Sequence, residues 1–223
     1  MARQPIGGAA ASPLDHRRQP GRRIRAAAAD ARAYRRGHDR ALPRTGGTMI
    51  SLSRKISLLG DFAVGKTSTV ARSVRNTFSD TYLTTVGVKV DTKAVMLDDG
   101  HSMKLVLWDI AGASSLDQMR ANYIGGTHGV LLVADGTRAD TVDTALGLYD
   151  QAARLLGRAL PAVLVLNKND LAGEWDVPPE RIRDLAERLP VFSASARTGE
   201  GVEEAFAALA RALAVSPNGS QPR

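Results

Sequence analysis

The chain has 223 residues, of which 43% are hydrophobic and 24% are charged, a composition typical of a globular protein. It contains no cysteine, which excludes disulfides, thiolate metal sites, cysteine nucleophiles and lipid anchors attached to cysteine. No apolar run approaches the length of a membrane-spanning helix.

The net charge of +7 is unevenly distributed along the chain. The first 48 residues contain 11 Arg and three Asp, a charge of +8, and the remainder of the chain carries −1. The high isoelectric point therefore belongs to the N-terminal segment, and we expect no nucleic-acid partner for the rest of the chain.

Residues 1–48 are rich in Arg, Ala, Gly and Pro without sustained hydrophobic periodicity, so we expect a basic, disordered tail. Three interpretations stay open. Met49 is the true start and the tail is not native, or the tail is a basic arm for anionic membranes or nucleic acid, or it is a targeting segment. A second short polar tail is expected over 216–223.

Between these tails, over 49–215, the apolar patterns predict strands that alternate with helices. In chain order we expect strand 56–59, helix 66–76, strands 89–97, 103–108 and 130–135, helix 140–156, strand 163–167, helix 178–188, strand 191–193 and helix 202–214. Asp98-Asp99-Gly100 predicts a hairpin turn between the second and third strands. This order predicts an α/β three-layer sandwich around a mostly parallel six-stranded sheet with one antiparallel edge strand.

The first motif is Gly60-Asp61-Phe62-Ala63-Val64-Gly65-Lys66-Thr67, which fits G-x-x-x-x-G-K-[ST]. Its glycines let the backbone wrap closely, so that N–H groups face phosphate oxygens, and the following helix adds the positive end of its dipole. We expect Lys66 to reach the β- and γ-phosphates and the Thr67 hydroxyl to bind Mg²⁺. The alternative is a surface turn with an exposed lysine, but the strand before and the helix after favour a phosphate loop.

The second motif is Asp109-Ile110-Ala111-Gly112, at the end of the strand that contains Trp108. A carboxylate at the carboxyl end of a strand is well placed to hold Mg²⁺ through water, and the Gly112 N–H to sense the γ-phosphate. The D-x-x-G pattern is weak alone, and its value comes from its order after the phosphate loop.

The third motif is Asn167-Lys168-Asn169-Asp170, directly after a buried strand. The Asp170 carboxylate is able to accept two N–H bonds from guanine, whereas adenine offers neither and would leave it unpaired. The alternative is an ordinary polar turn rich in Asn and Asp. The position after a buried strand favours guanine recognition over the turn.

Together these motifs resemble those of the Ras-like small GTPases, most similarly the Rab and Rho-like branches, over residues 54–214. The resemblance includes 108–112, 167–170 and the run 195–200, Ser-Ala-Arg-Thr-Gly-Glu. It implies a P-loop NTPase fold, GTP or GDP with Mg²⁺ as cofactors, and effector, exchange-factor and activating proteins as partners. Because no lipid site is present, we expect a cytoplasmic protein of bacterial origin that is recruited through protein partners. We also expect a monomer.

The resemblance also assigns roles to single residues. It implies that the Ala196 N–H meets the guanine oxygen, that Thr85 joins Mg²⁺ and the γ-phosphate only in the GTP state, and that the Phe78 ring packs on guanine. A core phenylalanine remains the alternative for Phe78. The two switch regions implied are 79–88 and 113–123.

The predicted site combines the three motifs with the resemblance. Residues expected to contact nucleotide are Asp61, Phe62, Ala63, Val64, Gly65, Lys66, Thr67, Ser68, Phe78, Thr85, Gly112, Asn167, Lys168, Asp170, Ser195, Ala196 and Arg197, which stands where the family usually has Lys. The expected metal ligands are Thr67, Thr85 and Asp109, and the expected catalytic residues are Lys66, Thr85 and Gly112.

Two departures from the family pattern bear on hydrolysis. Ala113 stands where the family usually has the glutamine that orients the attacking water, and Phe62 stands where it usually has a small residue. Gln118 is an unsuitable substitute, and Arg138 is too far along the chain to be an arginine finger. We therefore expect a switch with slow GTP hydrolysis. The alternatives are a GTP-bound scaffold without useful hydrolysis, and a P-loop ATPase or kinase, which the 167–170 motif disfavours.

Overall fold

A computed structural model of the chain describes residues 52–81, 84–112 and 122–215. Both predicted tails lie outside these ranges, so their boundaries stay predictions. Residues 82–83 of the first predicted switch and 113–121 of the second, with Ala113 and Gln118, also lie outside them.

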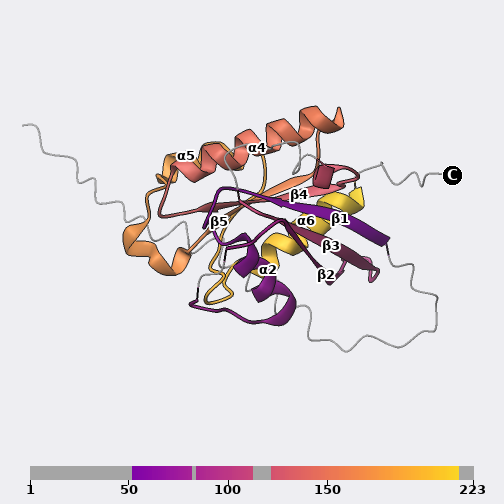
Figure 1. Cartoon of the computed structure of the whole chain (residues 1–223), viewed down its shortest axis with the longest axis horizontal. Helices are drawn as coiled ribbons and strands as arrows, with labels where there is room; N and C mark the ends of the chain where they lie inside the picture. Colours follow the sequence, from indigo (N-terminus) through magenta and orange to yellow (C-terminus); the bar gives the residue numbers. More distant parts are fainter. Residues whose placement is uncertain (1–51, 82–83, 113–121, 216–223) are drawn as a thin grey trace, which may run out of the picture. The chain divides into compact units, whose positions relative to one another are not determined.

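The described residues form a six-stranded sheet with helices on both sides (Figure 1). The elements are β1 (Leu52–Leu59), α2 (Lys66–Arg75), β2 (Val88–Met96), β3 (Ser102–Ile110), β4 (Gly129–Asp135), α4 (Asp140–Leu156), β5 (Ala162–Asn167), the 3₁₀ helix η1 (Asn169–Glu174), α5 (Pro179–Ala186), β6 (Val191–Ser193) and α6 (Val202–Val215). The strand order is β2-β3-β1-β4-β5-β6, with only the β2–β3 pair antiparallel. The predicted fold class is therefore confirmed.

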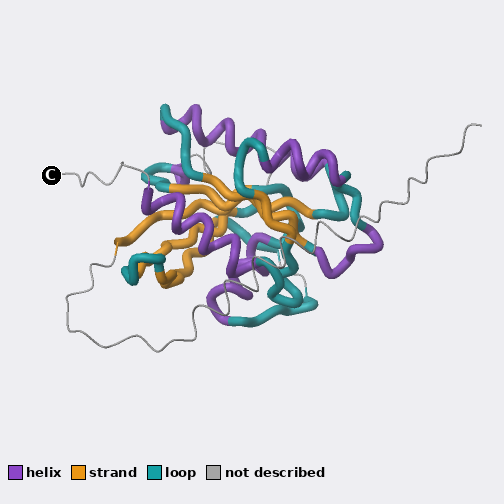
Figure 2. Tube along the Cα trace, turned by 180° about the vertical axis from the view of Figure 1, so that it is seen from behind, coloured by secondary structure: helices purple, strands orange, loops and turns teal. Residues whose placement is uncertain are grey.

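Two apolar cores separate the three layers. On one face of the sheet, α2 and α6 pack on inward side chains of the strands, with Phe206 of α6 fully buried. On the other face, α4 and α5 cover the sheet through residues such as Val142 and Leu185 (Figure 1, Figure 2). Every residue of β4 is buried, as expected for a central strand covered on both faces.

The structure shifts several predicted boundaries, most of them by one or two residues. β1 begins at Leu52, four residues before the predicted start, because its parallel pairing with β3 runs from Leu52 to Leu58 although its first residues are exposed. α5 ends at Ala186 rather than 188. None of the helices in the described ranges combines the length and apolarity needed to cross a bilayer.

The parallel strands place the predicted site. β1, β3, β4 and β5 run in the same direction, so their carboxyl ends, and the loops that follow them, meet at one edge of the sheet. Each of the three motifs lies at the carboxyl end of one of these strands. The phosphate loop follows β1, Asp109 is one of the last two residues of β3, and Asn167 is the last residue of β5. Motifs that are more than 100 residues apart in the chain are thereby neighbours.

Candidate nucleotide-binding site

Two positions of the phosphate loop leave no room for a side chain. Gly65 has φ of 96°, and a Cβ there would lie 2.2 Å from Nδ2 of Asn167. At Gly60 a Cβ would lie 2.1 Å from the Val133 carbonyl oxygen. Ala63 adopts φ of 60°, a left-handed conformation that costs a non-glycine residue about 1 kcal/mol. The loop thus lies close against β4 and the base motif.

Lys66 and Gly112 join the first and second motifs. The buried Lys66 ammonium donates to the carbonyl oxygens of Gly60 at 2.9 Å and Asp61 at 2.8 Å. A Cβ on Gly112 would lie 2.8 Å from Nζ of Lys66 and 2.6 Å from the Asp61 oxygen. Gly112 therefore lies directly over the loop, and no larger residue fits there.

Three predicted metal ligands gather beside the loop. The Thr67 hydroxyl donates to Oδ2 of Asp109 at 2.5 Å and lies 2.6 Å from the Thr85 hydroxyl. Oδ1 of Asp109 is buried without a hydrogen-bond partner. Burial is the largest influence on this carboxyl and raises its pKa, although Thr67 and Lys66 act in the opposite direction.

This arrangement fits a magnesium ion. Mg²⁺ takes oxygen ligands, commonly one or two carboxylates together with phosphate oxygens and water. The cluster offers two hydroxyls and a carboxylate whose second oxygen is unsatisfied, in surroundings that disfavour its charge unless a cation is near. Elsewhere in the described ranges, no group of three or more His, Cys, Asp or Glu side chains is placed to hold a metal.

The base motif is held to the loop that contains Ser195 and Ala196. Nδ2 of Asn167 donates to the Val64 carbonyl at 2.8 Å, and its Oδ1 accepts the Ala196 N–H at 3.0 Å. The Ser195 hydroxyl donates to Oδ1 of Asp170 at 2.5 Å, which fixes that carboxylate. The predicted contact of the Ala196 N–H with guanine stays a prediction, because in this structure that N–H donates to Asn167.

The other residues of the predicted site differ in exposure. Val64 is fully buried and belongs to the core cluster that includes Phe206, while Arg197 is exposed. Ser68 follows Thr67 in the first turn of α2 and is half-buried. The Phe78 ring is 37% exposed and belongs to neither core cluster, which argues against the core alternative. Phe62 is 49% exposed on the outer side of the loop.

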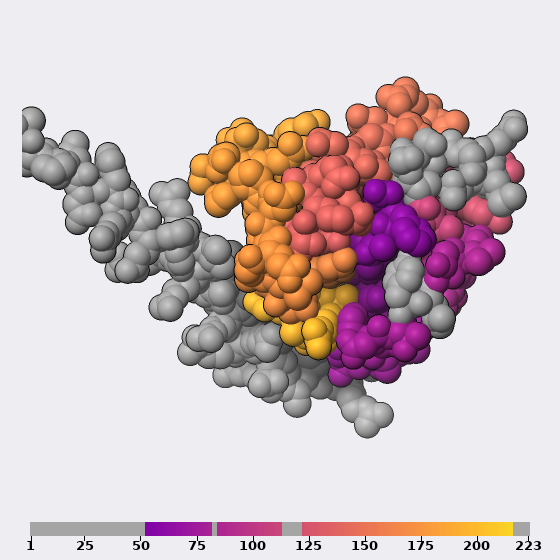
Figure 3. All heavy atoms as spheres, turned by 60° about the vertical axis from the view of Figure 1, so that its left-hand side comes forward, coloured from indigo at the N-terminus to yellow at the C-terminus, as the bar shows by residue number. Residues whose placement is uncertain are grey.

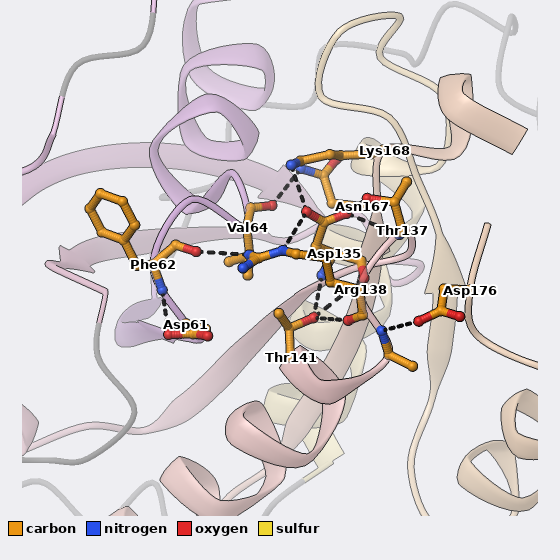
Figure 4. Close-up of polar contacts among 11 residues, drawn as sticks. Asp61, Phe62, Val64, Asp135, Thr137, Arg138, Thr141, Asn167, Lys168 and Asp176 are labelled. Atoms are coloured by element: carbon orange, nitrogen blue, oxygen red, sulfur yellow. Dashed lines mark hydrogen bonds and ion pairs between the residues drawn. The ribbon is translucent and has the colours of Figure 1, made fainter. Parts of the chain in front are cut away.

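Asp135 and Arg138 are functional candidates that none of the three motifs contains. Asp135 ends β4 and its Oδ2 accepts Nζ of Lys168 at 2.6 Å and Nε of Arg138 at 3.1 Å (Figure 4). Burial alone would raise the pKa of Asp135, but hydrogen bonds from Lys168 and Thr137 outweigh it and hold the pKa below its usual range. A carboxylate at the carboxyl end of a fully buried strand is the signal in the sequence that points to it.

Arg138 lies closer to the phosphate loop than its position in the chain suggests, although whether it acts as an arginine finger stays untested. Its Nη2 donates to the Phe62 carbonyl at 2.9 Å, so the side chain touches the phosphate loop although 76 residues separate the two positions. Distance along the chain was a poor guide because the loops after β1 and β4 adjoin at the sheet edge. Figure 3 shows the segment that includes the phosphate loop (indigo) beside the segment after β4 (salmon).

Arg72 is a second residue that the sequence patterns did not indicate. It lies in the last turn of α2, and its Nε donates to the Ala196 carbonyl at 2.8 Å while Nη2 contacts the Arg197 carbonyl. The guanidinium therefore fixes the predicted guanine-binding run to the helix that begins in the phosphate loop. No local pattern marks such a contact, since an arginine at the end of a helix is common.

Comparison with known proteins agrees with this geometry. A model of the Ras family matches residues 55–215. Similar curated proteins include Ras-related protein Rab-1D of Dictyostelium discoideum, 33% identical over 159 residues (70% of this chain, 78% of the relative). Ras-related protein RabG2 of the same organism is 35% identical over 161 residues (71% and 81%), and RABD2b of Arabidopsis thaliana is 31% identical over 161 residues (71% and 79%). Since the matched range contains every motif of the site, the chain belongs to the Ras family of small GTPases and has Rab-like relatives.

Proposed function

We propose that this protein is a GTP-dependent molecular switch whose own GTP hydrolysis is slow. The observation that carries the proposal is the contact of Thr85, from the first predicted switch, with Thr67 of the phosphate loop, beside Asp109. Thr85 reaches the metal side of the site from the segment just before β2. A ligand that binds Thr85 would therefore order this segment and change the exposed surface that the segment forms.

In this proposal the loop N–H groups and Lys66 hold the phosphates, and Thr67, Thr85 and Asp109 hold Mg²⁺ directly or through water. Bound Mg²⁺ supplies charge neutralisation on the phosphate oxygens. Gly112 keeps the space over Lys66 open, because any side chain there would clash with the ammonium. We propose that the Gly112 N–H donates a hydrogen bond to the γ-phosphate. Hydrolysis would remove this acceptor and so release the second switch.

Asp170 is proposed to select guanine. The carboxylate is exposed but oriented by Ser195, so a bound base would cover it. Guanine satisfies it with two N–H donors, whereas adenine would bury it without partners. The ATPase and kinase alternatives are disfavoured for this reason.

Slow hydrolysis is proposed from two side chains. Ala113 has no group that hydrogen-bonds a water molecule, so the family's usual means of orienting the nucleophile is missing. The half-exposed Phe62 ring occupies the outer side of the loop, where a partner's arginine would approach. Binding does not depend on either side chain, so GTP would persist until a partner supplies the water-positioning group.

The partners are proposed to dock beside the switch segment. Val86 is 90% exposed, and Val90 of the edge strand β2 lies opposite Trp108 of β3. The Trp108 ring is 6.2 Å from the Tyr123 ring, and Nζ of Lys55 lies 3.8 Å above its centre. These apolar and aromatic groups include Val90 of β2, a strand that begins three residues after Thr85, so we propose that an effector bound to them would respond to the nucleotide state.

Hydrogen exchange of residues 84–88 tests the switch. The proposal expects slower exchange with Mg²⁺ and a non-hydrolysable GTP analogue than with Mg²⁺ and GDP, and expects Thr85→Ala to abolish the difference. Thr84→Ala is the matched control, because Thr84 is exposed and should preserve the difference. Equal exchange in both nucleotide states of the natural sequence would contradict a switch.

A second candidate function is a GTP-bound scaffold without hydrolysis on a useful timescale. Ala113 and Phe62 favour it, whereas the intact set of Thr67, Thr85 and Asp109 favours a protein that senses the γ-phosphate. The two functions differ in whether bound GTP is cleaved at all, which a single-turnover measurement decides.

A further inference from the structure

Arg138 occupies a place that the motifs of the family site leave unassigned. We propose that Arg138, held by Asp135, is a positioning residue that fixes the Phe62–Ala63 peptide of the phosphate loop in the orientation needed for phosphate binding. The inference rests on the proposed nucleotide site and adds a residue to it.

The guanidinium of Arg138 is anchored by Asp135. This carboxylate is 1% exposed and accepts four hydrogen bonds. Oδ1 accepts from the Thr137 N–H at 3.0 Å and hydroxyl at 2.7 Å, and Oδ2 accepts from Nε of Arg138 and Nζ of Lys168. Because buried, charge-assisted bonds hold their partners in one geometry, Nη2 of Arg138 is presented to the phosphate loop in a fixed direction.

The backbone around Arg138 is fixed as well. Its N–H donates to the Asp135 carbonyl at 2.9 Å, and its own carbonyl accepts the Thr141 hydroxyl at 2.6 Å. The next N–H, of Ala139, donates to Oδ2 of Asp176 at 3.1 Å, which ties the start of α4 to the segment after η1 (Figure 4). The guanidinium therefore extends from a rigid loop rather than from a freely moving one.

The contact at Phe62 controls one peptide group. Nη2 of Arg138 holds the Phe62 carbonyl oxygen at 2.9 Å, and Figure 4 shows the Phe62 ring directed away from the guanidinium. In a trans peptide the C=O and the following N–H point in opposite directions. Holding this oxygen against Arg138 therefore turns the Ala63 N–H away from Arg138, toward the side where the loop would meet phosphate.

The same peptide is under conformational stress in this sequence. Ala63 has φ of 60°, a region that residues with a side chain rarely adopt. Rotating the Phe62–Ala63 peptide by half a turn would bring this φ to about −120°, an ordinary value, and would turn the Ala63 N–H away from the phosphates. The hydrogen bond from Arg138 opposes this rotation, because the rotation would remove the acceptor from the guanidinium.

A positioning role for Arg138 differs from a purely structural role in its effect on stability, because a structural residue would destabilise the nucleotide-free fold when it is removed. Its side chain is 41% exposed, and partly exposed ion pairs contribute little to stability. Removing the guanidinium should therefore leave the nucleotide-free fold almost as stable, while it weakens phosphate binding. Guanine selection should be unaffected, because it depends on Asp170 and not on the Phe62–Ala63 peptide.

The experiment measures dissociation of fluorescent GDP from the full chain with Mg²⁺, and competition by GTP and ATP. We expect Arg138→Ala to accelerate dissociation about tenfold without changing the preference for GTP over ATP. Arg138→Lys should restore little, because a single ammonium does not reproduce the fork that joins Asp135 to Phe62. Arg154→Ala is the matched control, since Arg154 is an exposed arginine in the last turn of α4.

A double variant separates positioning from general stabilisation. Glycine adopts positive φ without the cost that alanine has, so Ala63→Gly added to Arg138→Ala should slow dissociation again by about fivefold. The inference is overturned if Arg138→Ala matches Arg154→Ala, or if Ala63→Gly brings no recovery. If the natural sequence binds neither GDP nor GTP, the proposed function itself is wrong. That result differs from the two results that would overturn the role of Arg138 alone.

Discussion

Single residues of the phosphate loop carry the strictest requirements in this protein. At Gly65 two demands coincide, since φ is 96° and an added Cβ would meet Asn167 of the base motif. The phosphate loop and the base motif therefore pack together only because residue 65 has no side chain. Asp135 makes a comparable link by charge, because Lys168 of the base motif and Arg138 at the loop share its carboxylate.

Gly65→Ala should abolish nucleotide binding. The methyl group would displace Asn167 and strain the backbone, at a cost of about 1–2 kcal/mol in unfolding free energy and at least a hundredfold in GDP affinity. Gly147→Ala in α4 is the matched control, because its Cβ meets nothing within 4 Å and alanine should stabilise the helix by about 0.5–1 kcal/mol. Urea unfolding and GDP titration measure both effects, and normal GDP binding by Gly65→Ala would refute this account of the loop.

Asp135→Asn should destabilise the protein in a pH-dependent way. The pKa of Asp135 is lowered in the folded protein, so its charged form stabilises the fold above the unfolded pKa of about 4, and this contribution is lost as the pH falls through the folded pKa. At pH 7 we expect a loss of about 2 kcal/mol in urea unfolding, shrinking below pH 4, because the hydrogen bonds that Lys168 and Arg138 donate to the charged carboxylate are weakened.

The control for Asp135 is a carboxylate on the surface of α4. Asp143 pairs with Arg181 but is 67% exposed, so Asp143→Asn should cost less than about 1 kcal/mol at any pH. If both substitutions have the same pH-independent effect, the buried cluster around Asp135 has no special role.

At the scale of elements, the apolar patterns predicted nearly all helices and strands, because each buries one face or both. The fully buried β4 and the spaced apolar residues of α4 are clear cases. The start of β1 was missed because its exposed residues are defined by pairing with β3 and not by apolarity. The three motifs were found because their residues are contiguous, whereas Asp135, Arg138 and Arg72 were not, since their partners are 33 to 125 residues away.

The dependence of the sheet on α6 gives a prediction at this scale. Phe206 is fully buried between α6 and the sheet, and Phe206→Ala should cost about 3–5 kcal/mol in unfolding free energy through lost apolar contact and a residual cavity. Leu155→Ala on the outer face of α4 is the control, with an expected effect below about 0.5 kcal/mol, since Leu155 is 57% exposed. A similar small effect at both positions, measured by urea unfolding, would mean that α6 is not part of the cooperative core.

At the scale of the whole molecule, the family match begins at residue 55 and β1 at Leu52. We predict that the 49–223 fragment keeps the midpoint of thermal unfolding and the GDP affinity of the full chain, because it retains all of β1. A fragment that begins at residue 57 should be much less stable, since it loses most of the pairing between β1 and β3. A large loss of stability or affinity on removing 1–48 alone would show that this segment takes part in the fold.

The central claim concerns what happens to bound GTP, and single-turnover hydrolysis tests it most directly. GTP would be loaded on the full chain and on Ala113→Gln, and cleavage started with Mg²⁺. A switch that retains the glutamine cleaves GTP at a rate of ~4 × 10⁻⁴ s⁻¹, which is a half-life of about 30 min. We predict a half-life well beyond this value for the natural sequence. We predict cleavage roughly tenfold faster in Ala113→Gln. Cleavage by the natural sequence within a few minutes would contradict the account, because another residue would then position the water.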